Sequence, residues 1–150
     1  MTRLRRSLGD DTGAVSVFVI GLVLVLMVVA GLVVDGGRAI NARSALADDA
    51  EQAARAGANQ IDENQLRLTG DVRIDPHAAR IGAAEFLAVR GYGPEQVTVD
   101  ADATQVHVSL TRVVPTQLLS LIMINDFTVD GEATARAAVG IVAELPEGAP

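Results

Sequence analysis

The sequence predicts an α+β protein in which a long N-terminal membrane helix continues into an Ala-rich helix and then into a small antiparallel-sheet domain. Three observations support this fold class: an uncharged apolar run, a stripe of small residues at helical spacing behind it, and alternating strands in the C-terminal half. In chain order we expect a basic leader over 1–13, a transmembrane helix over 14–34, an Ala-rich helical extension over 35–61, a small α+β extracytoplasmic domain over 62–144 and a flexible tail over 145–150.

The apolar run extends from Ala14 to Val34 and contains no charged residue, and fifteen of its side chains are Val, Leu, Ile or Phe. As a helix it is about 31 Å long at 1.5 Å per residue, which matches the hydrocarbon thickness of a bilayer. Those fifteen side chains favour insertion by about 5–9 kcal/mol. The run is therefore predicted to cross a membrane once.

A cleaved secretory signal is the alternative, because arginines precede the run and Val28-Val29-Ala30 resembles a cleavage motif. The run continues past Ala30 and exceeds the usual length of a signal's apolar core, which favours a retained anchor. The arginines also favour a cytoplasmic N-terminus. The expected location is the cell membrane, with one span and the C-terminal domain outside the cytoplasm.

The segment after the run predicts a second helix with an unusually small-sided stripe. Gly36 and Gly37 are expected to kink or hinge the chain at the membrane surface, and without a break the combined helix has about 48 residues. Arg38 follows Asp35 at a spacing that allows the two side chains to pair at the membrane edge. The stripe either covers the protein's own sheet or packs against helices of neighbouring subunits, and it consists of Ala39, Ala42, Leu46, Ala50, Ala53, Gly57 and Ile61.

From Val72 onward the pattern predicts a β-α-β-β-α-β order with an antiparallel sheet. A short strand comes first, and a helix capped by Asp75 follows it as far as Gly91. Strict alternation then predicts two strands joined by a turn, and a final strand starts near Asp126. The residues expected to point to the core from the two middle strands are Val97, Val99, Val106, Val108 and Leu110.

The second helix of this order is predicted over Thr116 to Ile124, TQLLSLIMI. It has too many apolar side chains for one face of a short helix. The segment is therefore either fully buried or in contact with a partner or lipid. The residues of this contact helix are Leu118, Leu119, Ile122 and Met123.

The sequence contains no catalytic or ligand-binding pattern. The net charge of −7 without a basic patch disfavours nucleic acid, and the absence of cysteine excludes thiolate chemistry. No phosphate-binding, dinucleotide, zinc-protease or nucleophile-elbow motif occurs. His77 and His107 are expected at the surface, and Asp100 and Asp102 in an ordinary turn. We therefore expect no enzyme, cofactor, metal site or small-molecule substrate.

Several stretches resemble the TadE/TadG-like group of tight-adherence (Flp-type) pilus-assembly proteins. They are Gly13-Ala14-Val15 after an arginine-bearing leader, GLVVDGGRA at the end of the anchor, ALADDAEQAARAGA in the Ala-rich helix, VRIDP, and VPTQLLSLI before the last strand. The likeness is closest to the actinobacterial type, from high-GC Gram-positive bacteria, and covers most of the chain.

The resemblance implies a pilin-like membrane protein that acts in assembly of an adhesive pilus, with membrane lipid and other pilus-assembly membrane proteins or pilin-like subunits as partners. It also implies cleavage by a prepilin peptidase between Gly13 and Ala14. Phe18 stands where the family usually has glutamate. An uncleaved assembly factor that stays in the membrane is therefore the alternative to a processed subunit. The alternative from a different class is a generic membrane-tethered binding domain of another envelope complex.

Overall fold

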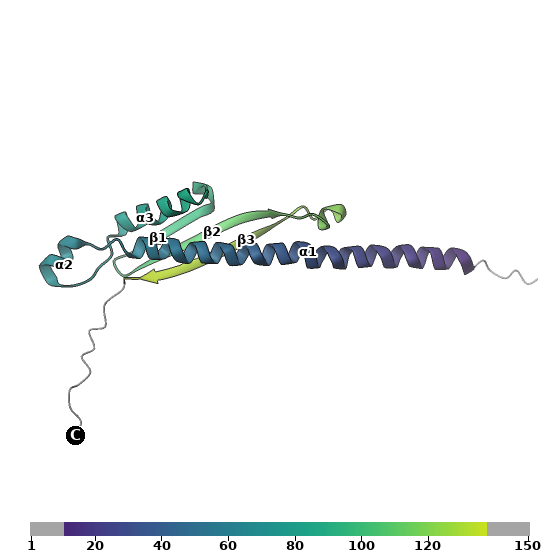
Figure 1. Ribbon diagram of the computed structural model, residues 1–150, viewed down its shortest axis with the longest axis horizontal. Coiled ribbons are helices and arrows are strands. Elements are labelled where there is room, and N and C mark those ends of the chain that lie inside the picture. The colour runs from purple at the N-terminus through teal and green to yellow at the C-terminus, as the bar shows by residue number, and fades with distance from the viewer. Residues whose placement is uncertain (1–10, 138–150) are drawn as a thin grey trace, which may run out of the picture. The chain divides into compact units, whose positions relative to one another are not determined.

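The computed structural model describes residues 11–137, with side chains from Val15 onward. In chain order the elements are α1 (Asp11–Ala58), α2 (Glu63–Thr69), α3 (Pro76–Val89), the 3₁₀ turn η1 (Pro94–Gln96), β1 (Val97–Ala101), β2 (Gln105–Pro115), the 3₁₀ turn η2 (Leu119–Ile122) and β3 (Asp126–Arg136), as Figure 1 shows. The predicted leader lies almost wholly outside the described residues, and the predicted tail lies wholly outside them.

The chain separates into two compact units, each built from two stretches of sequence. The apolar unit comprises Met1–Arg38 and Pro115–Asp126. The sheet unit comprises Ala39–Val114 and Phe127–Pro150. The linear pattern did not suggest that residues 115–126 group with the apolar helix.

Helix α1 runs through Gly36 and Gly37 without interruption and has 48 residues. The unbroken alternative is therefore right, and the glycines do not end the helix. Glycine weakens a helix by only about 1 kcal/mol relative to alanine, and the alanine-rich turns that follow have high helix propensity.

The sheet of the sheet unit has the strand order β1-β2-β3, and β1 pairs antiparallel with β2. In Figure 1 β3 runs back along the other side of β2. The predicted alternation in the two middle strands is confirmed, because every second residue of β2 from Val106 to Leu110 is buried. In register, the inward residues pair as Val97 with Leu110, Val99 with Val108, and Ala101 with Val106.

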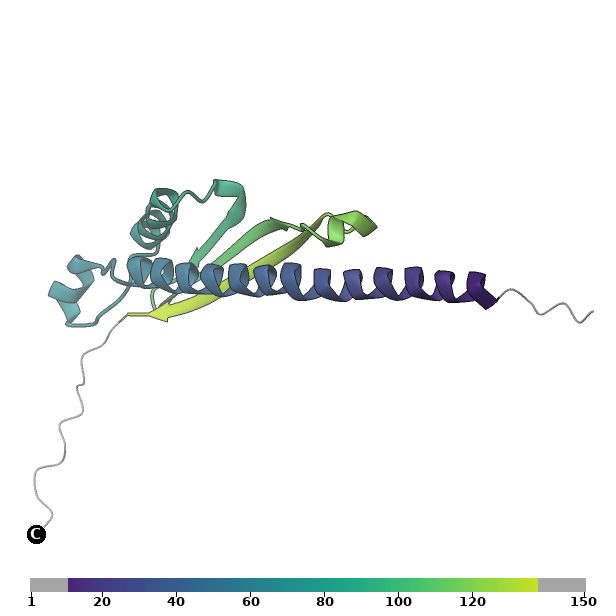
Figure 2. The same ribbon diagram turned by 45° about the vertical axis from the view of Figure 1, so that its right-hand side comes forward.

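The core of the sheet unit forms where the second half of α1 and helix α3 meet the inward residues of the strands. The two helices and the strands can be followed in both ribbon views (Figure 2). Gly57 allows a close approach to α3 and β2, because a Cβ there would lie 2.9 Å from the carbonyl oxygen of Ala79 and 3.1 Å from the side chain of Val106. Small side chains on α1 thus let a second helix and a strand pack against it.

The predicted strand at Val72 to Ile74 is wrong. Ile74 makes only an isolated antiparallel bridge with Ile61, and the chain before it forms the short helix α2 instead. Asp62 caps α2 by accepting hydrogen bonds from the amides of Asn64 and Gln65, each at 3.0 Å. Helix α2 buries none of its residues, so it leaves no hydrophobic periodicity in the sequence.

The predicted helix at Thr116 to Ile124 is also wrong in type and length. Only Leu119–Ile122 form a single 3₁₀ turn, which ends at Met123 with a φ of 69°. A left-handed residue stops the turn, because continued helix needs a negative φ. The observed order is therefore a long helix, two shorter helices and a three-stranded sheet, in place of β-α-β-β-α-β.

Candidate functional site

The first half of α1 presents a continuous apolar surface. Its large apolar side chains between Val15 and Val34 are 40–72% exposed. By length and composition α1 can cross a membrane, and among the described residues it is the one helix that can. A core helix of a soluble protein would bury these side chains, so their exposure favours a lipid-facing helix.

Asp35 is the first residue after the apolar run, and its side chain is only 1% exposed. Its Oδ1 accepts a hydrogen bond from the amide of Gln117 at 2.9 Å. Its Oδ2 accepts from the amides of Leu118 and Leu119, at 2.9 and 2.8 Å. One carboxylate therefore holds the start of η2 against α1, within the apolar unit; we call this contact the Asp35 clasp.

The clasp also explains the electrostatics of the carboxyl group. The amide hydrogen bonds, that from Leu119 foremost, and the positive charge of Arg38 lower the pKa of Asp35, although burial acts in the opposite direction. Hydrogen bonds to the charged form favour ionisation. Among the described residues no ion pair joins Asp35 to Arg38, whose positive charge acts on the carboxylate from a greater distance.

Gly31, one turn before Asp35, allows the close approach of α1 and η2. A Cβ at this position would lie 3.1 Å from the side chain of Leu119 and 3.2 Å from that of Leu118. The glycine and the carboxylate therefore lie on the same face of α1, four residues apart.

The segment predicted as a contact helix is partly buried and partly exposed. Leu119 is 3% exposed, whereas Leu118, Ile122 and Met123 are 37%, 46% and 90% exposed. The alternative of full burial is thus wrong for most of the segment. An apolar groove of about 450 Å³ lies within the apolar unit, lined by Leu24, Met27, Val28, Ala30, Leu118, Leu119, Leu121 and Ile122.

The small-residue stripe divides between core and partly exposed positions. Its members Leu46, Ala50, Ala53 and Gly57 are buried within the sheet unit. These four cover the protein's own sheet and α3, so they are not free to contact a neighbouring subunit. The remaining predicted members, Ala39, Ala42 and Ile61, are half-buried, and Ile61 lies beyond the end of α1.

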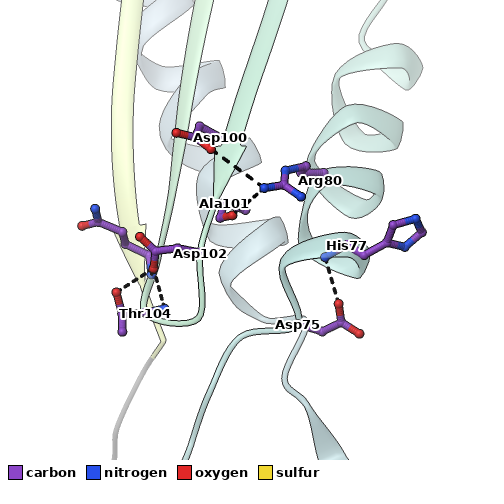
Figure 3. Close-up of polar contacts among 8 residues, drawn as sticks. Asp75, His77, Arg80, Asp100, Ala101, Asp102 and Thr104 are labelled. Carbon is purple, nitrogen blue, oxygen red and sulfur yellow. Dashed lines mark hydrogen bonds and ion pairs between the residues drawn. The ribbon is translucent and has the colours of Figure 1, made fainter.

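The polar candidates do not converge on one site. His77 lies in the first turn of α3 with its ring directed away from Asp75, which caps the helix, as Figure 3 shows. The ring of His107 contacts the hydroxyl of Thr134 on β3, with 3.0 Å between Nδ1 and Oγ1. Over residues 11–137 no group of three or more His, Asp or Glu side chains could hold a metal ion.

Asp102, in the β1–β2 turn, and Asp100, near the end of β1, both have structural partners. Asp102 accepts hydrogen bonds from the amide and hydroxyl of Thr104 and from the amide of Gln105, which lower its pKa. Asp100 lies 3.9 Å from the guanidinium of Arg80 (Figure 3). These contacts close a turn and tie it to α3.

A cluster in the sheet unit joins α1 to the end of α3. The hydroxyl of Tyr92 donates a hydrogen bond to Asp49 at 2.6 Å, and Arg90 forms an ion pair with the same carboxylate. The guanidinium of Arg112 lies 4.9 Å from the centre of the Tyr92 ring. Sequence patterns had not singled out this cluster, because its members are far apart in the chain.

Tyr92 provides a titration test of this cluster. Burial, followed by the hydrogen bond to Asp49, raises the pKa of Tyr92 to about 12 from the ordinary value of 10.0. It is the only tyrosine of the sequence, so phenolate absorbance reports it alone. Because the folded pKa is the higher one, this group's contribution to stability is present below pH 10.0 and is lost as the pH rises to about 12. We expect Asp49→Asn to lower the midpoint of the Tyr92 titration. Asp48→Asn, a substitution at an exposed neighbouring residue, should leave this midpoint unchanged. A wild-type midpoint near 10.0 would contradict the cluster.

The structure thus brings together Asp35 and the segment at Leu118 and Leu119, which sequence reasoning had treated separately. The signal was present: one carboxylate directly follows an uncharged run, and a distant apolar segment needs partners for its amides. Gly13 and Ala14, the predicted cleavage pair, lie in the first turn of α1. Nothing in the geometry tests their cleavage, which stays a prediction.

Helix α1 resembles part of a known protein family. Residues 13–60 match the family model described as putative Flp pilus-assembly TadE/G-like. No curated protein and no solved structure matches the chain. The matched residues coincide with helix α1, Asp11–Ala58, and with the two residues after it. The resemblance seen in the sequence is confirmed over residues 13–60, where the chain matches this family model.

Proposed function

We propose that this protein is a membrane-anchored, non-catalytic and pilin-like component or assembly factor of a tight-adherence (Flp-type) pilus or a related secretion system. The observation that carries the proposal is the coincidence of the TadE/G-like match at residues 13–60 with the single helix α1. The family match supports the assignment to pilus assembly, and the apolar half of the helix supports the membrane contact.

The two halves of α1 suit an anchored subunit. The first half exposes its apolar side chains, and the second half is built into the core of the sheet unit through residues such as Leu46 and Ala50. We further propose that the N-terminus is cytoplasmic and the sheet unit extracytoplasmic, from the arginines before the run.

Deletion of the chain tests the proposal directly. We expect loss of surface pili and of adhesion, restored by the wild-type gene and equally by a Leu68→Ser variant, because Leu68 is exposed on α2 and is 82% accessible. Detergent extracts should contain the pilus ATPase and platform proteins together with this chain. Unchanged pilus production in the deletion strain rejects the proposal, and co-purification with a different envelope complex supports the generic tethered domain instead.

A further inference from the structure

The η2 segment, residues 118–124, is apolar and unusually exposed. Leu121 is 69% exposed and Met123 is 90% exposed, and residues 116–124 contain no charge. A soluble surface rarely presents a contiguous uncharged patch of this kind without a contact to make. The patch lies in the apolar unit, beside the part of α1 that is expected in the bilayer.

The position of the groove sets how far along the helix this patch extends. Its α1 side begins at Leu24, eleven residues before Asp35, or roughly 16 Å along the axis at 1.5 Å per residue. The η2 side chains therefore lie alongside the C-terminal half of the run from Ala14 to Val34. A bilayer that covers this half of the run also reaches the η2 segment.

Backbone amides of the segment donate their hydrogen bonds to acceptors within the protein, which suits an environment without water. Polar backbone groups in a membrane must find partners within the protein, since lipid offers none. The Asp35 clasp satisfies the amides of residues 117–119. Three further amides donate to carbonyls within the segment: Leu121 to Leu118, Met123 to Ser120, and Ile124 to Leu119. The amide of Thr116 donates to the carbonyl of Asn125, just outside the two ends of the segment.

We propose that residues 118–124 form a second membrane contact, a wedge that enters the same leaflet as the C-terminal half of the apolar helix, with lipid acyl chains filling the groove beside it. The occupant is lipid rather than a second protein copy, because the groove continues the apolar surface of the anchor itself. The inference rests on the anchoring part of the proposed function.

Two membrane contacts would restrict the orientation of the anchor more than a single helix can. A lone transmembrane helix is free to rotate about its axis and to change its tilt, and interfacial side chains restrict both. The clasp joins the wedge to α1 through contacts between residues 82 to 84 positions apart in the sequence. The anchor would therefore enter the membrane in one defined rotational position.

Site-specific fluorescence tests the wedge, and the absence of cysteine makes each label unique. The full-length protein carries Leu121→Cys, Leu68→Cys or Val23→Cys with an environment-sensitive fluorophore, in vesicles of phosphatidylcholine and phosphatidylglycerol at high lipid-to-protein ratio. Leu68 is the matched control, because it is an exposed leucine of the sheet unit, and Val23 marks the apolar run. Quenchers are nitroxides on acyl chains and aqueous iodide.

We expect the label at position 121 to be quenched by the acyl-chain nitroxides and protected from iodide, as at position 23, and the label at 68 to behave oppositely. If the label at position 121 behaves like that at 68 while the label at 23 is quenched by the acyl-chain nitroxides, the proposed wedge is wrong but the membrane helix is supported. If 121 is protected from both quenchers, protein covers it, which also overturns the proposal. If 23 itself is open to iodide, the anchor fails and the wedge fails with it.

Discussion

Replacing Asp35 by alanine is expected to release the η2 segment from α1. The substitution leaves the amides of Gln117, Leu118 and Leu119 without their acceptor. We expect these amides to exchange hydrogen faster by roughly one to two powers of ten, because leaving a buried donor unpaired costs on the order of 1–3 kcal/mol. Hydrogen–deuterium exchange of the full chain in detergent micelles measures the effect.

Two variants make this result specific. Asp35→Asn keeps one acceptor oxygen and places an amide donor against the remaining amides, so its exchange should be intermediate. Asp75→Ala removes a similar carboxylate cap from the amides of His77 and Ala78, and it should leave residues 117–119 protected. Unchanged exchange rates of the amides of residues 117–119 in Asp35→Ala would contradict the Asp35 clasp.

Introducing a single methyl group at Gly131 is expected to destabilise the sheet unit. Gly131 lies in the middle of β3 against α1, and a Cβ there would lie 2.5 Å from the amide nitrogen of Ala47 and 2.6 Å from the Cβ and carbonyl carbon of Leu46. Helix backbone cannot turn aside as a flexible side chain does, so the strand and the helix must separate. We expect Gly131→Ala to cost about 3 kcal/mol, the upper end of the usual range for overpacking.

Tyr92 provides the measurement for this variant, because it is the only tyrosine, the chain has no tryptophan, and its side chain is in the core. Thermal unfolding followed by its fluorescence should shift downward by roughly 10–20 °C in Gly131→Ala. Gly37→Ala is the matched control, because a Cβ there meets open space in the middle of α1. It should unfold no earlier than wild type, since alanine favours a helix over glycine by about 1 kcal/mol. Equal unfolding temperatures of Gly131→Ala and wild type would show that β3 and α1 are not packed closely enough to exclude a methyl group.

The elements that sequence reasoning located well are those with a repeated local signal. The apolar run, the helix from Pro76 and the paired strands around Val99 and Val108 each repeat a pattern over many residues. Helix α2 was missed because it buries no residue, and the strand expected at Ile74 formed only one bridge. Two backbone hydrogen bonds flank that bridge: the amide of Asp62 donates to the carbonyl of Arg73, and the amide of Asp75 donates to the carbonyl of Gln60.

The η2 segment shows why local pattern was insufficient. Its apolar composition suggested a helix, but its first two amides and that of the preceding Gln117 donate to Asp35, and Met123 has a left-handed φ. These are long-range and conformational facts, which neither propensity nor periodicity records. Gly131 is similar: in sequence it is one small residue of an alternating strand, and only the packed structure shows that nothing larger fits.

The sequence alone determined that the chain has one long apolar helix, an Ala-rich continuation, paired strands and a likeness to TadE/G-like pilus-assembly proteins. Each of these follows from composition and short-range spacing, which the chain displays without folding. The tertiary structure decided which amides donate hydrogen bonds to the carboxylate of Asp35 and which segment lies beside the apolar helix. It also decided at which glycines two elements approach closely. The physical reason is that burial and hydrogen bonding between distant residues depend on where the folded chain brings them together.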